Sequence, residues 1–139
     1  MNFEGDLSLL QRKMAASSAG VQRRQAVMEA LNVRSGQSIL DLGCGGGHLV
    51  EELARAVGPH GKAFGLDPSK TQIQAARERC NRFDQATFCC CMADEIALKA
   101  ASCDAVASIQ TLEYIEDVDA ALSAVIPLLK AQSKFVNIS

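Results

Sequence analysis

The chain has 139 residues, a formal net charge of −2, 48% hydrophobic residues and 22% charged residues, values that are typical of one globular domain. The near-neutral charge argues against a nucleic-acid partner, because duplex-binding proteins carry a basic face. No apolar run of about 18 residues occurs and the first residues do not resemble a signal peptide, so no membrane contact and a cytoplasmic location are expected.

Helices and strands are expected to alternate along the chain, beginning with a short helix over residues 6–16. The next elements are expected in this order: helix 21–31, strand 37–42, helix 48–57, strand 62–66, helix 69–82, strand 86–91, strand 102–109, helix 117–130 and strand 134–138. This alternation predicts an α/β fold: a Rossmann-like, three-layer α/β/α sandwich with a mostly parallel sheet of about five strands.

A glycine-rich turn over residues 43–47 follows the first expected strand and precedes a helix. Glycines let the backbone turn tightly and approach a ligand without a Cβ in the way. The dinucleotide pattern G-x-G-x-x-G fails here, because His48 stands where the third glycine is required. The pattern acid-x-Gly-x-Gly-x-Gly fits instead, with its four positions filled by Asp41, Gly43, Gly45 and Gly47.

The stretch from Ile39 to Gly47 resembles the first motif of class I S-adenosylmethionine-dependent methyltransferases, of the small-molecule type that includes the ubiquinone and menaquinone methyltransferases. The resemblance extends over most of the chain. It implies that the glycine loop passes under the methionine moiety and ribose of S-adenosylmethionine, with Asp41 near the amino-acid end of the cofactor. A tight turn that binds no ligand is the alternative interpretation.

Asp67 ends the second expected strand and is followed by Pro68. A carboxylate at this position can accept hydrogen bonds from both ribose hydroxyls, as it does in dinucleotide-binding folds, and the resemblance implies the same role. Asp67 and Ser69 also suit the start of a helix, and this structural role competes only in part with ribose binding.

The sequence departs from the methyltransferase pattern after the third expected strand. Met92 stands where the family commonly has an adenine-binding acid, and Asp94 follows two residues later. Met92 can pack on the adenine ring through its sulfur, and the Ala93 N–H can bind a ring nitrogen. Whether Asp94 reaches the adenine amino group stays open. The turn at residues 129–133 also lacks the usual glycines, so no residue suited to a positive φ is expected there.

The fourth expected strand ends in Ser108, Ile109 and Gln110, which the resemblance places facing the transferred methyl group. No Asn-Pro-Pro-Tyr sequence occurs, which favours a small-molecule acceptor over a base or amide nitrogen. The residues expected to bind the cofactor are Asp41, Gly43, Cys44, Gly45, Gly47, Asp67, Pro68, Met92, Ala93, Asp94, Ser108, Ile109 and Gln110. No catalytic nucleophile is expected, and Glu113 and Tyr114 are general-base candidates by position only.

The six cysteines are expected to be small buried residues, and no metal site is expected. A chain that is not secreted rarely forms disulfides, and neighbouring residues on a strand point to opposite faces, which disfavours a shared metal. Thiol or metalloid chemistry is the less favoured alternative. His48 and His60 are expected to have surface roles.

Residues 1–19 are expected to form an N-terminal helical extension, and residues 20–139 a methyltransferase domain that lacks the last two strands of the family. Either the chain is a fragment, or a second copy covers the apolar edge at residues 135–138 as a homodimer. The expected function is direct methyl transfer from S-adenosylmethionine to a small-molecule acceptor. The alternatives are a cofactor-binding module without turnover and, less favoured, an NAD-dependent oxidoreductase.

Overall fold

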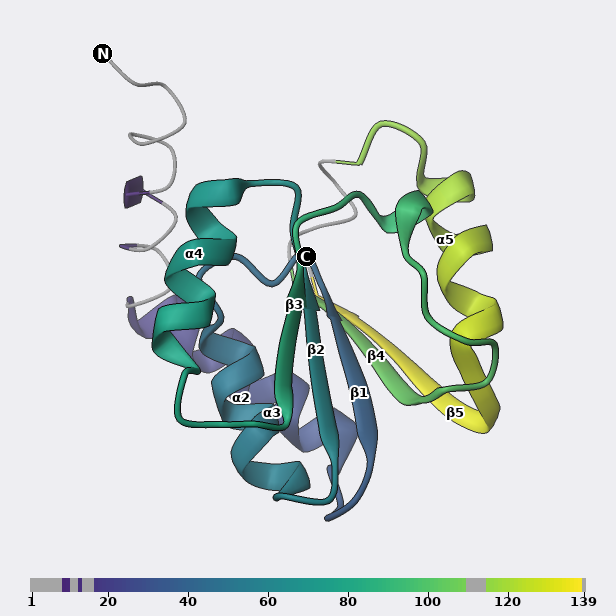
Figure 1. Cartoon of the computed structure of the whole chain (residues 1–139), viewed down its shortest axis with the longest axis horizontal. Helices are drawn as coiled ribbons and strands as arrows, with labels where there is room; N and C mark the ends of the chain where they lie inside the picture. The colour runs from purple at the N-terminus through teal and green to yellow at the C-terminus, as the bar shows by residue number, and fades with distance from the viewer. Residues whose placement is uncertain (1–8, 11–12, 14–16, 110–114, 139) are drawn as a thin grey trace.

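Five parallel strands form one sheet in the order β3-β2-β1-β4-β5 (Figure 1). The computed structural model describes residues 9, 10, 13, 17–109 and 115–138. Its strands are β1 (Ser38–Leu42), β2 (Lys62–Leu66), β3 (Ala86–Cys89), β4 (Cys103–Ile109) and β5 (Leu129–Ile138). Its helices are α2 (Ser18–Leu31), α3 (His48–Val57), α4 (Lys70–Arg79) and α5 (Val118–Val125), with the 3-10 helices η1 (Ala93–Glu95) and η3 (Ile126–Leu128).

The central strand β1 lies between β2 and β4, and the strand order reverses at this point. Asp41 is paired with Gly65 of β2 on one side and with Ala107 of β4 on the other. Because all strands are parallel, their carboxyl ends meet at one edge of the sheet. Ligands in such sheets bind outside these ends, where the order reverses.

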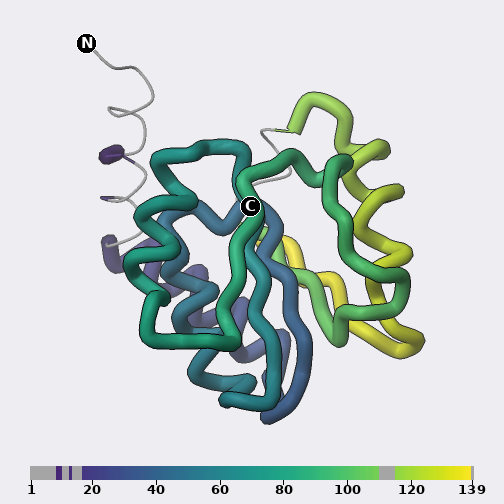
Figure 2. The backbone as a smooth tube through the Cα atoms, viewed as in Figure 1, coloured from purple at the N-terminus to yellow at the C-terminus, as the bar shows by residue number. Residues whose placement is uncertain are grey.

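Helices cover the two faces of the sheet unequally. Helices α2, α3 and α4 lie on one face, and α5 lies on the other (Figures 1 and 2). Successive residues of β1 serve the two faces in turn: Ile39 packs in the core with α2, α3 and α4, and Leu40 packs in the core with α5. The expected three-layer α/β/α architecture is confirmed.

Short polar side chains begin most of the helices. Ser17, Ser69 and Asp117 each accept a hydrogen bond from a backbone N–H three residues later, at 3.2, 3.3 and 3.0 Å. Helix α3 differs, because Gly47 precedes it and supplies no side-chain cap. The first turn of α3 therefore presents backbone N–H groups at the carboxyl edge of the sheet.

Strand β5 contacts the C-terminal end of helix α2. Lys134 Nζ donates to the carbonyl oxygens of Ala30 and Leu31 at 3.2 and 3.5 Å. These carbonyls end α2, where a cation is favourable because the helix leaves acceptors unpaired there. Val136 and Ile138 pack against the core that contains Leu31. Strand β5 and helix α2 thus stabilise each other.

Five expected boundaries differ from the structure by two residues or more. Helix α2 starts at Ser18, three residues earlier than expected. Helix α4 ends at Arg79 and strand β3 at Cys89, each earlier than expected. Helix α5 ends at Val125, because Pro127 lacks an N–H and the chain continues as η3. Strand β5 starts early, at Leu129, and its pairing with β4 is irregular between Cys103 and Ala105.

The expectation that no residue near this turn would adopt a positive φ is wrong. Gln132 has φ +62°, a conformation that costs a side chain about 1–2 kcal/mol, and it lies exposed within the irregular part of β5. The irregular pairing with β4 therefore uses a left-handed glutamine where the methyltransferase family commonly has glycine.

Two further expectations concern the ends of the described chain. Most of the helix expected at residues 6–16 lies outside the described residues. Pairing of β5 with a second copy stays a prediction. No helix in the described part of the chain is long and apolar enough to cross a membrane.

Candidate functional site

The glycine-rich loop after β1 is fixed by its own backbone. Gly43, Gly45 and Gly47 have φ of +75°, +54° and +84°, in the left-handed region that favours glycine. Cys44 N–H donates to Leu66 O of β2 at 2.8 Å, and Gly47 N–H donates back to Cys44 O at 3.1 Å. The loop is therefore shaped by hydrogen bonds within the protein.

Close packing also requires glycine beside this loop. A Cβ on Gly47 would lie 2.9 Å from Ala76 of α4. A Cβ on Gly65 would lie 2.8 Å from the Cys44 sulfur and from Phe88. The Cys44 side chain thus packs in the core, and burial raises the pKa of its thiol well above the usual range. The sequence analysis did not identify Gly65 as part of the site.

Two hydrogen bonds from the C-terminal end of helix α4 stabilise the glycine loop, and the sequence did not predict them. Arg79 Nε donates to Gly46 O at 3.1 Å, and the Cys80 thiol donates to Gly47 O at 3.7 Å. Both contacts join residues 33 positions apart. No motif spacing signals them, because they depend on how α4 folds back against α3.

Asp67 lies directly beside the glycine loop. Its Oδ2 accepts a hydrogen bond from Gly45 N–H at 3.1 Å, and its Oδ1 accepts one from Ser69 N–H at 2.9 Å. Partial burial raises the pKa of this carboxyl, and the two N–H donors act in the opposite direction. Each carboxylate oxygen has a further lone pair, so the group can accept bonds from two hydroxyls of a ligand.

Asp41 is buried, with 3% of its surface exposed, and no described residue donates a hydrogen bond to its carboxylate. Burial raises its pKa to about 7, and the negative charge of Asp67 contributes further. A buried carboxyl without a partner destabilises the fold, and a cation next to it would relieve that cost. The site therefore suits a positively charged ligand group.

The residues after β3 form a more open region. Met92 is 46% exposed, Ala93 is buried and Asp94 is exposed. Met92 N–H donates to Glu95 Oε1 at 2.8 Å, which closes η1 on itself. No hydrogen bond among the described residues joins Met92 or Asp94 to Asp67 or to the glycine loop. The structure therefore brings Asp41, Gly45 and Asp67 together and, within the described part of the chain, joins neither Met92 nor Asp94 to them by a hydrogen bond.

The end of β4 contributes a buried hydroxyl. Ser108 is fully buried opposite Leu42, and its Oγ has no hydrogen-bond partner within the described part of the chain. Ile109 is half-buried beside it, and Pro68 is exposed. Gln110, Glu113 and Tyr114, which the sequence singled out, lie outside the described residues.

His48, expected at the surface, is half-buried at the start of α3. Burial lowers its pKa to about 4, and the charges of Arg79 and Arg24 lower it further. The imidazole is therefore neutral at pH 7. The surface role expected for His60 fits its exposed position.

The expectation that all six cysteines are buried is wrong for three of them. Cys44, Cys80 and Cys103 are buried as expected, but Cys89 and Cys90 are exposed and Cys91 is half-buried. All six are free thiols. Within the described ranges, no group of three histidine, cysteine or acidic residues could hold a metal ion.

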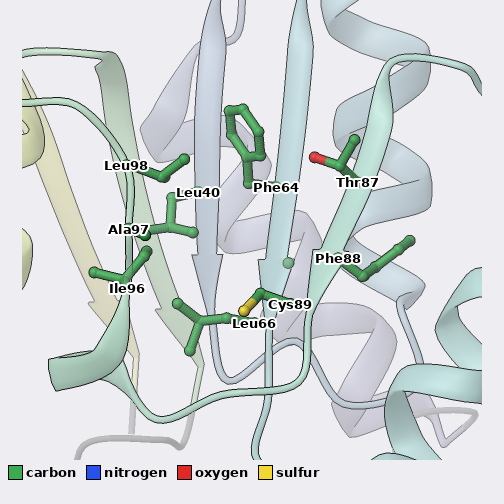
Figure 3. A pocket seen from close by; sticks show the side chains of 10 residues that line it. Leu40, Phe64, Leu66, Thr87, Phe88, Cys89, Ile96, Ala97 and Leu98 are labelled. Atoms are coloured by element: carbon green, nitrogen blue, oxygen red, sulfur yellow. The ribbon is translucent and has the colours of Figure 1, made fainter.

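A cavity of about 230 Å³ lies on the face of the sheet that α5 occupies (Figure 3). Its walls come from β1, β2, β3 and the chain at residues 96–98, and none of the residues expected to bind the cofactor lines it. The side chains that line it include Leu40, Phe64, Leu66, Cys89, Ile96 and Leu98. It is a separate, mostly apolar cavity and is distinct from the site around Asp67.

A family model described as a methyltransferase domain matches residues 33–139. An uncharacterized 37.1 kDa protein of a Streptomyces fradiae transposon is 28% identical over 124 residues, which are 89% of this chain and 36% of that protein. The ubiquinone biosynthesis O-methyltransferase of Bartonella quintana is 30% identical over 95 residues, 68% of this chain and 37% of that enzyme.

A demethylmenaquinone methyltransferase of a Geobacillus species is 39% identical over 56 residues, 40% of this chain and 24% of that enzyme. The matched segments thus span 24–37% of the lengths of these three relatives.

Solved structures share the fold. An S-adenosylmethionine-dependent methyltransferase from Aquifex aeolicus superposes with a TM-score of 0.74 at 19% identity, covering 81% of this chain and 62% of that one. Phosphoethanolamine N-methyltransferase 2 of Haemonchus contortus, in complex with phosphomonomethylethanolamine and S-adenosylhomocysteine, gives a TM-score of 0.74 at 25% identity and covers 83% of this chain and 27% of that one. The family match spans most of the sequence and agrees with the parallel sheet, so the chain belongs to the class I S-adenosylmethionine-dependent methyltransferases.

Proposed function

We propose that this chain binds S-adenosylmethionine at the carboxyl edge of its sheet and transfers the methyl group to a small-molecule acceptor. The observation that carries the proposal is the Asp67 carboxylate, which Gly45 N–H and Ser69 N–H hold beside the glycine loop. Both oxygens keep a lone pair for the two ribose hydroxyls. The carboxylate is therefore oriented before any ligand arrives.

Asp41 supports the same cofactor. Its buried carboxyl lacks a donor among the described residues and has a pKa raised to about 7. The amino-acid end of S-adenosylmethionine carries an ammonium group, which would stabilise the ionised form of Asp41. The buried Ser108 hydroxyl at the end of β4 offers a further polar contact on the opposite face of the sheet. The residues present thus fit the group.

The bound cofactor supplies a methyl carbon that is already activated by a positively charged sulfur. The protein then has to align an acceptor and exclude water, which can contribute about 7–11 kcal/mol. We assign the positioning of the cofactor to Asp41, Asp67 and the loop at residues 43–47. The half-buried Ile109 would contribute an apolar wall at the end of β4. No nucleophile of the protein is required.

A small-molecule acceptor agrees with the named relatives. Two of them are called demethylmenaquinone methyltransferase and ubiquinone biosynthesis O-methyltransferase. The fold alone does not fix the reaction, since a [4+2]-cyclase, SpnF, has a TM-score of 0.71 with this chain at 23% identity. Binding and turnover therefore need separate tests.

Calorimetric titration with S-adenosylmethionine and S-adenosylhomocysteine tests the binding, with NADH as the negative control. We expect both sulfur compounds to bind and NADH not to bind. Asp67→Asn should lower their affinity roughly 10–100-fold, because hydrogen bonds to a charged group are lost. The matched control is Asp84→Asn, on the exposed turn before β3, which should bind as the wild type does. Equal affinities for the two variants would contradict the role of Asp67.

Transfer of a labelled methyl group to a panel of phenols, quinols and primary amines tests the turnover. Label in any of these acceptors supports the proposed reaction. Cofactor binding without label transfer to any member of the panel would favour a binding module without turnover.

A further inference from the structure

Three consecutive cysteines, Cys89 to Cys91, stand at the end of the edge strand β3, where the chain enters the candidate cofactor site. Strand β3 ends at Cys89, and Met92 begins the stretch expected to bind adenine. Cys89 and Cys90 are exposed, and Cys91 is half-buried. Cys89 also lines the apolar cavity on the α5 face (Figure 3). The thiols thus lie between the edge of the sheet and the site, and the proposed function assigns them no role.

Two of these cysteines contact the turn that carries Asp67. The N–H of Asp67 donates to the carbonyl of Cys89 at 3.2 Å. The thiol of Cys90 donates to the carbonyl of Pro68 at 3.5 Å. Asp67 in turn accepts from Ser69 N–H and Gly45 N–H. Any group added to the Cys90 sulfur therefore competes for the space next to the Asp67–Ser69 turn.

Reactivity should differ strongly among the six thiols, because the thiolate is the nucleophile. Burial raises the pKa of Cys44 well above its usual range, that of Cys80 to about 11 and that of Cys91 to about 12, where Cys89 adds to the effect. Burial also raises the pKa of Cys103. The exposed pair Cys89 and Cys90 remains the accessible target for reagents in solution.

We propose that Cys90 is a site of reversible thiol modification by low-molecular-weight disulfides, and that an adduct on its sulfur loosens the Asp67–Ser69 turn and weakens cofactor binding. The effect on the cofactor rests on the proposed function, whereas the effect on the turn rests on the contact with Pro68 alone.

The reaction is a disulfide exchange. The Cys90 thiolate attacks one sulfur of oxidised glutathione, whose S–S bond breaks while a Cys90–glutathione S–S bond forms. The second glutathione leaves as a thiolate and takes up the proton that Cys90 has lost. The modified sulfur has no proton left, so the hydrogen bond from Cys90 to Pro68 O is lost. The hydrogen bond from Asp67 N–H to Cys89 O then still joins the Asp67–Ser69 turn to the cysteine segment.

The test treats the full chain with oxidised glutathione and locates the adducts by peptide mass mapping. Amide hydrogen exchange at Asp67 and Ser69 then reports on the turn, and titration with S-adenosylhomocysteine reports on the site. We expect an adduct on Cys90, faster exchange at both amides and an affinity lower by about threefold or more. Dithiothreitol should reverse all three effects.

Two variants separate Cys90 from its neighbour. Cys90→Ser keeps a donor for Pro68 but cannot form a disulfide, so it should bind the cofactor as the wild type does and resist glutathione. Cys89→Ser keeps the Cys90 thiol and should remain sensitive. The absence of an adduct on Cys90, or an adduct with unchanged exchange at Asp67 and Ser69, would overturn the proposal. If the untreated chain fails to bind S-adenosylhomocysteine, the proposed function fails, and the exchange data still decide whether the adduct loosens the turn.

Discussion

The glycine loop at residues 43–47 and the connection at residues 90–102 both begin at the carboxyl edge of the sheet but are held in different ways. In the loop, left-handed glycines pack directly on β2 and α4, and the backbone bonds to Leu66 and Arg79. The connection contains the three-residue helix η1, an exposed Met92 and a non-glycine residue, Ala101, at φ +53°.

This difference divides the proposed cofactor site. The half expected to bind the ribose and the methionine moiety is ordered by packing and hydrogen bonds of the protein itself. The half expected to bind adenine contains the exposed Met92 and Asp94, packs on α5 through Ala93 and lies beside an apolar cavity. Substitutions in the loop should therefore lower the free energy of unfolding, whereas substitutions in the connection should mainly lower the affinity for the ligand.

The largest effect is expected for Gly47→Ala. The new Cβ would lie 2.9 Å from Ala76 at φ +84°, so both a clash and a left-handed strain arise. We expect a loss of about 4 kcal/mol in the free energy of unfolding, measured by urea denaturation. Gly36→Ala is the matched control, because φ is +86° and no atom lies within 4 Å of the added Cβ. The control should lose about 1–2 kcal/mol, and equal losses would show that packing of the loop on α4 does not matter.

Asp41→Asn should change the pH dependence of stability. The Asp41 carboxyl of the wild type releases its proton near pH 3.8 in the unfolded chain and near pH 7 in the folded chain. Between these pH values the unfolded chain therefore binds fewer protons than the folded chain. Ionisation of Asp41 thus lowers wild-type stability as the pH rises to 7, by about 4 kcal/mol, and the contribution is nearly constant above that.

His48 acts in the opposite sense, because its pKa is lowered from 6.5 to about 4 and its contribution rises with pH over that range. The measured quantity is therefore the difference in unfolding free energy between Asp41→Asn and the wild type. This difference should grow in favour of the variant from pH 4 to pH 7, while the variant binds S-adenosylmethionine more weakly. A difference that is independent of pH would mean that Asp41 is ionised throughout.

A smaller effect is expected for Met92→Ala in the connection. Met92 is 46% exposed, so its removal should leave the unfolding free energy within about 0.5 kcal/mol of the wild type. Loss of a sulfur contact with adenine should weaken S-adenosylhomocysteine binding about two- to tenfold, measured by calorimetry. An unchanged affinity would remove Met92 from the site. A large loss of stability would contradict the contrast between the two regions.

The smallest effect is expected for Ala101→Gly, which is the reverse of the change at Gly47. Ala101 has φ +53°, and glycine adopts this conformation without the Cβ strain. The greater entropy of glycine in the unfolded chain offsets part of the gain. We expect stabilisation by about 0.5 kcal/mol in urea denaturation. A destabilised variant would show that Ala101 is held by its contacts rather than strained.

The segment from β1 to β2 could be predicted closely from the sequence. The bounds of α3 and β2 agree with the expectation to the residue. The glycines and Pro59 between them mark where the apolar periodicity of the helix ends and that of the strand begins. The start of β5 could not be predicted, since its irregular pairing with β4 depends on the neighbouring strand. The assignment of the cofactor-binding residues stays a prediction.

Contacts between distant segments and the exposure of two cysteines could not be predicted from the sequence. Arg79 reaches Gly46 across 33 positions, and no local pattern encodes that distance. Cys89 and Cys90 were expected to be buried because free cysteine usually is. They are exposed because β3 is an edge strand of the sheet, so no further strand of the described residues covers its outer side.

The bond from Lys134 to the end of α2 has a consequence for synthesis on the ribosome. Lys134 and Ala30 are 104 positions apart, so α2 emerges roughly 5–20 s before the strand that completes its packing. During that interval the face with Val27 and Leu31 lacks the cover that Val136 and Ile138 later provide. The nascent chain must therefore keep an incomplete apolar layer from aggregating until β5 has been translated, which is the situation in which chaperones bind.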